Sequence, residues 1–116
     1  MPQETQDTLK EILKKIQGDV HFDDWKYQRI ERVLSEVPEE ISHISTQFNE
    51  KGLHEIIKSE NEFLLGVLIS FVYYKFLIYS SFDSDPIHKD EIPLFQKSIL
   101  SNSSKFLDLI FKTLEK

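Results

Sequence analysis

The stretch FLLGVLISFVYYKFLIYSSF, residues 63–82, decides the fold. It carries one charged side chain, Lys75, and as a helix it is long enough to cross either a small domain or a bilayer. A helix that is apolar on every side is normally surrounded by other helices or by lipid. The rest of the chain must therefore indicate which of these two environments covers it.

The flanks of this stretch favour a buried bundle helix over a membrane span. Lys75 would cost free energy in lipid unless it reached the bilayer surface. Two glutamates, Glu60 and Glu62, precede the stretch, and two aspartates, Asp83 and Asp85, follow it. Membrane spans are instead flanked by positive charge. We therefore expect a soluble bundle, with membrane association as the less favoured alternative.

Two segments before this stretch have helical periodicity. The first runs from about residue 5 to residue 17, and Gly18 offers a C-terminal stop. The second follows Asp23 or Asp24, either of which offers an N-cap carboxylate, and ends within residues 49–52. Its apolar stripe steps by three and four through Tyr27, Ile30, Leu34, Val37, Ile41, Ile44 and Phe48.

Pro38 interrupts this second segment, because proline removes a backbone donor and clashes with the preceding turn. Either one long helix is kinked at Pro38, or one helix ends near Glu36 and another begins with Pro38 in its first turn. The apolar stripe keeps its register across the proline. This favours the continuous, kinked helix.

The second half of the chain adds two more helical segments. One is expected from about Leu53 to Ser81, and the other from about Asp90 to Leu114. The polar run over residues 101–104 competes for backbone groups, so the last segment has a natural breaking point there. The predicted fold is all-α: residues 1–116 form one domain, an up-down bundle of four or five helices around an apolar central helix.

Composition excludes several classes of protein. The 116 residues include no cysteine, which rules out disulfides and thiolate zinc sites and is compatible with the cytoplasm. The polar start, residues 1–15, does not resemble a secretory signal. The net charge is −6 and the only arginines are Arg29 and Arg32, so we expect no nucleic-acid binding.

Histidines supply only weak candidates for a metal site. Glu40 and His43 form one Glu-x-x-His unit, the spacing that di-iron bundles use twice together with two further glutamates. Here there is a single unit, and the apolar stripe runs through Ile41 and Ile44, so we expect Glu40 and His43 to flank the core. The favoured interpretation is a solvated helix face.

The segments 21–24 and 88–91 share a histidine followed by acidic residues just before a helix. In an up-down bundle both helix starts fall at the same end, where His21 and His88 would join carboxylates as ligands. The alternative, which we favour, is that these carboxylates cap the helices and complement their dipoles. We expect no bound metal and no other cofactor.

No motif names a reaction, so we expect a non-enzymatic interaction or assembly module. The three glycines are scattered, and no serine lies in a nucleophile elbow. The first helix is short and leaves a gap beside residues 73–79, where an aromatic patch would mark an interface. We predict a homodimer, or binding to another protein, with Tyr74, Phe76 and Tyr79 as contacts.

Two other functions stay open. One is a bundle that binds a small ligand or a metal, with or without enzymatic activity. It requires polar groups such as Tyr73, Tyr74, His43 and Lys75 to converge on one cavity. The other is a membrane-associated helical protein.

Overall fold

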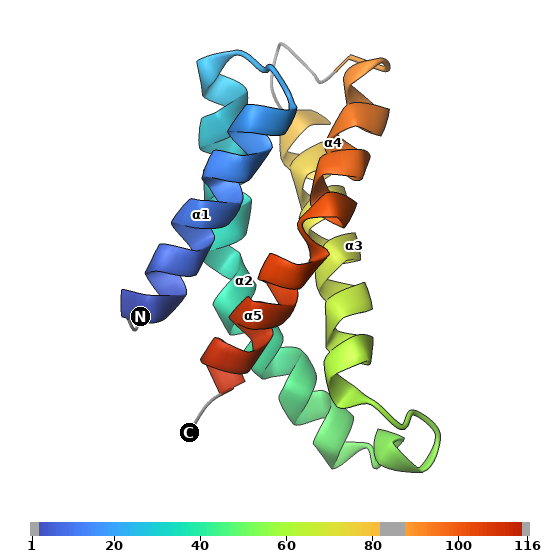
Figure 1. The fold of residues 1–116 in the computed structure, drawn as a ribbon. Coiled ribbons are helices and arrows are strands. Elements are labelled where there is room, and N and C mark those ends of the chain that lie inside the picture. The colour runs from blue at the N-terminus through green and yellow to red at the C-terminus, as the bar shows by residue number, and fades with distance from the viewer. Residues whose placement is uncertain (1–2, 82–87, 115–116) are drawn as a thin grey trace.

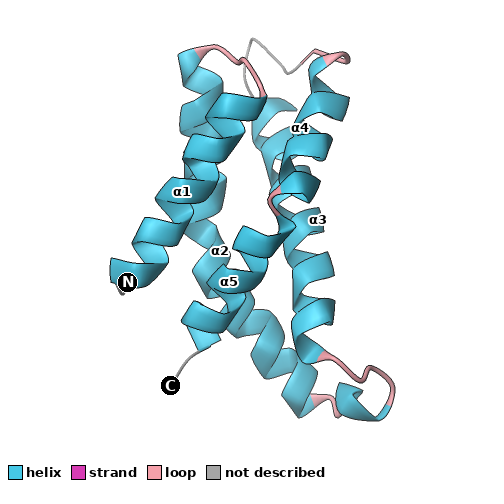
Figure 2. Cartoon of the chain, in the orientation of Figure 1, coloured by secondary structure: helices cyan, strands magenta, loops and turns pink. Residues whose placement is uncertain are grey.

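The chain folds into five α-helices and one 3-10 turn, in a computed structural model that describes residues 3–81 and 88–114. The helices run alternately up and down, and α4 and α5 together form the last leg (Figure 1). No strand occurs within the described ranges (Figure 2). The expected all-α bundle is confirmed, with five helices. Their bounds are α1 Gln3–Asp19, α2 Asp24–Glu50, α3 Glu60–Ser81, α4 Glu91–Ser101 and α5 Ser103–Leu114.

α2 is one continuous helix of 27 residues with Pro38 inside it. The predicted apolar stripe supplies most of its buried line, from Ile30 through Val37 to Phe48. Burial of this line against α1, α3 and α5 supplies the free energy that offsets the missing proline donor. The prediction of a continuous helix is therefore confirmed.

α3 begins later than expected, so the predicted start near Leu53 is wrong. Residues 53–55 form only a 3-10 turn, preceded by Gly52 in a left-handed conformation with φ 65°. The helix starts at Glu60, where the Oγ atom of Ser59 accepts a hydrogen bond of 3.2 Å from the backbone N–H of Glu62. Ser59 with Glu62 three residues later has the spacing of a capping box, which the sequence already contained.

The predicted break in the last leg is confirmed at Asn102. This residue is buried between α4 and α5, and its Nδ2 atom donates to the carbonyl oxygen of Ser98 at 2.7 Å. The same carbonyl oxygen also accepts the backbone N–H of Asn102 at 3.1 Å, so the side chain and the backbone of Asn102 compete for one acceptor at the junction. The break lets α4 pack on α1 and α3 while α5 packs on α1, α2 and α3.

α1 extends two residues beyond the predicted segment at each end, and Gly18 lies inside it. Its buried line passes through Thr5, Thr8, Ile12 and Ile16, whereas Leu9 and Leu13 are only half-buried. The buried line of α1 thus includes two threonines, and α1 packs against both α2 and α5.

α3 is fully buried along one line and half-buried on either side of that line. Five of its 22 residues are buried, at every fourth position: Leu64, Leu68, Val72, Phe76 and Ser80. The helices that pack on α3 are α2, α4 and α5. Within the described residues, α3 is the helix that is long and apolar enough to cross a membrane.

Candidate functional site

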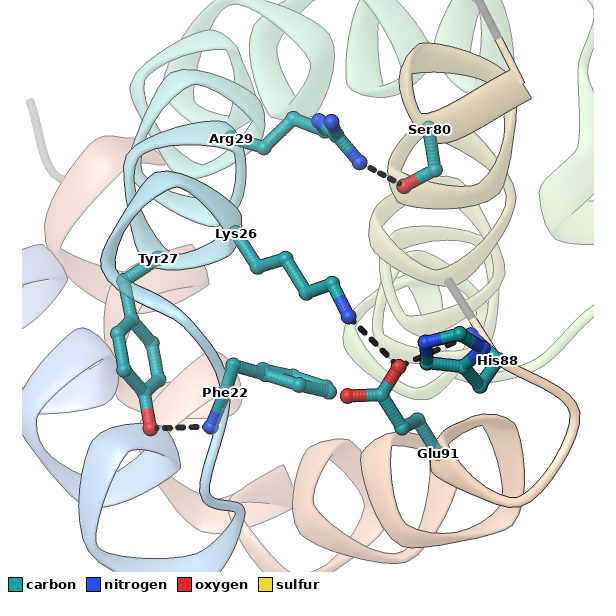
Figure 3. Close-up of polar contacts among 7 residues, drawn as sticks. All are labelled: Phe22, Lys26, Tyr27, Arg29, Ser80, His88 and Glu91. Carbon is teal, nitrogen blue, oxygen red and sulfur yellow. Dashed lines mark hydrogen bonds and ion pairs between the residues drawn. The ribbon is translucent and has the colours of Figure 1, made fainter. Parts of the chain in front are cut away.

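Lys26 is a buried cation at the end of the bundle where α2 and α4 begin. Only 2% of it is exposed, and its Nζ atom donates to Oε1 of Glu91 at 2.7 Å (Figure 3). The same Glu91 oxygen accepts the backbone N–H of His88 at 2.9 Å. One carboxylate thus joins the first turn of α2 to the first turn of α4.

Aromatic rings surround this ion pair. Phe22, Phe76 and Phe95 are buried together, with the Phe76 and Phe95 ring centroids 4.4 Å apart. The Nζ atom of Lys26 lies 5.7 Å from the Phe22 centroid and 5.2 Å from the Trp25 centroid. Cation–π attraction and the Glu91 charge together compensate the lost hydration of the ammonium.

A second cation, Arg29, follows one turn later on the same side of α2. Its Nη1 atom donates to Oγ of Ser80 at 2.7 Å, and its guanidinium carbon lies 4.0 Å from the Trp25 centroid. Ser80 belongs to the last turn of α3, where the helix dipole favours positive charge. We call Phe22, Lys26, Arg29, Ser80 and Glu91 the ion-pair end of the bundle.

The loop before α2 is tied down by Tyr27. Its hydroxyl accepts the backbone N–H of Phe22 at 2.8 Å (Figure 3). The same hydroxyl donates to the carbonyl oxygen of Val20. These bonds hold Phe22 against Phe76 and Phe95, whose ring centroids lie 5.9 Å and 6.2 Å from its own. Phe22 of this loop is therefore part of the core.

Burial acts to raise the pKa of Glu91, but several interactions outweigh it. These are the hydrogen bond from Lys26, the bond from the His88 backbone N–H, and the positive charges of both residues. The pKa of Glu91 therefore lies below its ordinary value, and the ion pair is formed at neutral pH. The charges of Lys26 and Glu91 are paired with each other, as in a structural contact.

The two loops suspected of sharing ligands do meet, but through Lys26 and not through histidines. His21 and His88 have exposed side chains, as does His43, and Glu40 is half-buried. Within residues 3–81 and 88–114, no group of three or more histidines and carboxylates is placed to hold a metal ion. The sequence missed Lys26, although it precedes Ile30 by four residues and so shares the buried line of α2.

The three predicted interface residues lie in different environments. Phe76 is fully buried in the core, so its prediction as a surface contact is wrong. Tyr79 is half-buried and donates to Oε1 of Glu36 at 2.6 Å, beneath the guanidinium of Arg32. Tyr74 is 60% exposed. Of the three, Tyr74 alone has the exposure that an interface residue needs.

Tyr74 belongs to a row of exposed residues that runs along α3 opposite its buried line. We call this the outward row; it consists of Gly66, Ser70, Tyr74 and Ile78. None of the residues from 63 to 74 is charged, and Lys75 lies to one side, 5.4 Å from the ring centroid of Tyr79. The half-buried neighbours of the row are Phe63, Val67, Tyr73 and Leu77.

A hollow of about 200 Å³ lies beside the outward row, between residues of α3 and residues of α4. Ser70, Tyr73 and Tyr74 line it on one side, and Gln96 and Leu100 on the other. Leu100 is 59% exposed, so the apolar surface continues from α3 onto α4. Lys75 and His43 do not line this hollow, so the four polar groups named as markers of a ligand cavity do not converge there.

A second hollow, of about 360 Å³, lies between α1 and α2. Leu9, Leu13 and Leu34 supply its apolar lining, and Lys10 and Glu31 stand among its polar residues. Its size is at the lower limit for small-ligand sites. Neither hollow combines an enclosed cavity with convergent polar groups.

Known proteins offer no guide to the function. No protein-family model, curated protein or solved structure matches the chain.

Proposed function

We propose that this protein is a non-enzymatic helical assembly module that self-associates through the outward row of α3. The observation that carries the proposal is the mismatch between composition and burial in α3. The helix carries no charged side chain from residue 63 to residue 74, yet only five of its 22 residues are fully buried. Contiguous apolar surface of this kind marks interaction sites in soluble proteins.

The length of the surface suits a helix–helix interface. A helix of 22 residues is about 33 Å long, and the outward row from Gly66 to Ile78 covers about 18 Å of it. Leu100 and the neighbouring hollow widen the surface on one side. Together they provide an apolar centre with Glu62 and Lys75 at its margins, the usual anatomy of an interface.

The charge distribution favours a second copy of the chain as the partner. The chain carries a net charge of −6, so two copies repel each other over most of their surfaces. The outward row carries no charge, and two copies meet there without opposing carboxylates. An apolar face in an acidic protein thus directs where self-association occurs.

Sedimentation equilibrium of the full chain without detergent tests this proposal. Two variants form a matched pair: Tyr74→Glu on the outward row, and Ile56→Glu at an apolar position that is 79% exposed elsewhere. Wild type and Ile56→Glu are expected to have dimer mass at micromolar concentrations. Tyr74→Glu is expected to be monomeric, because the interface would bury a carboxylate without a partner.

Three outcomes would overturn the proposal. The first is a wild-type chain that remains monomeric throughout the micromolar range. The second is a dimer that Tyr74→Glu leaves as stable as Ile56→Glu does. The third is recovery of the chain only with lipid or detergent, which would assign the apolar face of α3 to a membrane.

A further inference from the structure

We infer that two copies pair through antiparallel α3 helices, with Ser70 on the two-fold axis and Tyr74 of each copy seated over Gly66 of the other. The inference rests on the proposed function and specifies its geometry. It follows from where Ser70 lies on the helix and from what stands on either side of it.

Ser70 is close to the centre of the outward face. With about 3.6 residues per turn, the five buried residues of α3 cluster around a direction that points away from Ser70. Its side chain is small and exposed. The closest approach of a second helix therefore falls at Ser70, where little side-chain bulk separates the two backbones.

Gly66 and Tyr74 are placed symmetrically about this centre. Each lies four residues from Ser70, or about 6 Å along the helix axis. Gly66 is exposed, and a Cβ atom added to it would have no neighbour within 4 Å. Tyr74 is a large aromatic side chain with 60% of its surface exposed. The row thus has a gap at Gly66 and a projecting side chain at Tyr74, at equal distances on either side of Ser70.

Only the antiparallel arrangement brings gap and projection together. A two-fold axis through Ser70 places Tyr74 of one copy opposite Gly66 of the other, and the reverse pair forms by symmetry. A parallel arrangement in register would set Tyr74 against Tyr74 and leave Gly66 facing Gly66 across an unfilled space. The antiparallel pair also sets the two helix dipoles in opposition.

The residues next to the row fit the same axis. Val67 and Tyr73 each lie three residues from Ser70, and Phe63 and Leu77 each lie seven residues away. Antiparallel pairing therefore sets apolar side chains opposite apolar side chains over four turns. Glu62, eight residues from Ser70, falls at the edge of the contact, where water reaches it.

Single cysteines test this geometry directly, because the natural chain contains none. The variants are Ser70→Cys, Gly66→Cys and Tyr74→Cys, at positions that are exposed in the single chain. Ile56→Cys is the control for random collision. A disulfide requires Cα atoms within about 7 Å of each other. Under mild oxidation, the covalent dimer is measured on non-reducing gels, and the mass before oxidation is measured by sedimentation.

Ser70→Cys is expected to link to itself at least tenfold faster than Ile56→Cys. Gly66→Cys and Tyr74→Cys are expected to link slowly alone and rapidly when mixed, since the mixed dimer keeps one Tyr74–Gly66 contact. Rapid self-linking at all three row positions would show a parallel pair and overturn the inference. A dimer in which Ser70→Cys links no faster than Ile56→Cys would overturn the geometry and leave the proposed function standing. A monomeric wild-type chain would overturn both.

Discussion

At the ion-pair end of the bundle, a lysine, an arginine and a phenylalanine are buried, and the polar atoms named there have partners. Along the outward row of α3, a tyrosine and an isoleucine are 60% and 48% exposed. Both regions belong partly to the same helix, since Ser80 lies at the first and Tyr74 lies at the second.

The difference shows which region is available for function. At the ion-pair end, Lys26 and Glu91 neutralise each other and Arg29 donates to Ser80, so this region stabilises the fold. The outward row is uncharged surface that the described residues leave exposed, at a cost in solubility. The region with the most polar chemistry is therefore structural, and the region with the least is the candidate interface.

The largest expected effect separates two aromatic residues that are two positions apart on α3. Phe76→Ala should lower the free energy of unfolding by about 3–5 kcal/mol, because it removes a fully buried ring beside Phe95. Tyr74→Ala should change it by less than about 0.5 kcal/mol at dilutions where the chain is monomeric. Urea unfolding followed by circular dichroism measures both. Equal losses would contradict the assignment of the two residues to core and surface.

The ion pair should show an asymmetry between its partners. Glu91→Ala should cost about 2–4 kcal/mol, because it leaves the buried ammonium of Lys26 without its carboxylate. Lys26→Met should cost about 1 kcal/mol, since Glu91 is partly exposed and keeps the His88 backbone donor. Urea unfolding of the two variants at neutral pH provides the comparison. A larger loss for Lys26→Met than for Glu91→Ala would show that burial of the lysine is not the dominant cost.

The pH dependence of stability should depend on the same Lys26–Glu91 ion pair. The pKa of Glu91 is lower in the folded chain than its ordinary value of 4.5. Its contribution is therefore complete above that ordinary value and is lost as the pH falls through the lower, folded value. Thermal unfolding of wild type should lose stability over this acidic range more steeply than Glu91→Gln does. Parallel curves would mean that Glu91 does not titrate with the fold.

The smallest expected effect concerns an exposed ion pair far from both regions. Lys105 donates to Oε2 of Glu11 at 2.9 Å, and this hydrogen bond with the charge of Lys105 lowers the pKa of Glu11. Both side chains are in water, so Glu11→Gln should leave the unfolding midpoint unchanged within error. A clear loss of stability in urea, abolished by high salt, would show that this exposed ion pair contributes to the free energy of unfolding.

Much of the fold could be predicted from periodicity. The stripe from Tyr27 to Phe48 identified α2 as one helix in spite of Pro38, because a run of seven apolar positions outweighs one missing donor. The polar run around Asn102 marked the break between α4 and α5 for a local reason, competition for backbone bonds. The start of α3 was missed, although Ser59 and Glu62 supply a local signal for it.

The candidate sites were harder to predict because they depend on tertiary arrangement. Tyr74 and Phe76 are both aromatic and lie in a uniformly apolar stretch, so composition does not indicate which of them faces the core. Lys26 was overlooked because a lysine at a helix start normally lies in water, and its partner Glu91 is 65 residues away. Such contacts follow from how the helices pack, which periodicity alone does not define.

Hydroxyl-radical footprinting over a range of protein concentrations tests the central claim most directly. The oxidation rate of Tyr74 should fall as the concentration rises through the dimer range, because a second copy covers the outward row. The rate at Ile56, which is also exposed and lies away from the row, should stay constant. In Tyr74→Glu, the neighbouring Leu100 should remain as reactive at high concentration as at low. A Tyr74 oxidation rate that does not change with concentration, in a chain that remains folded, would contradict the account.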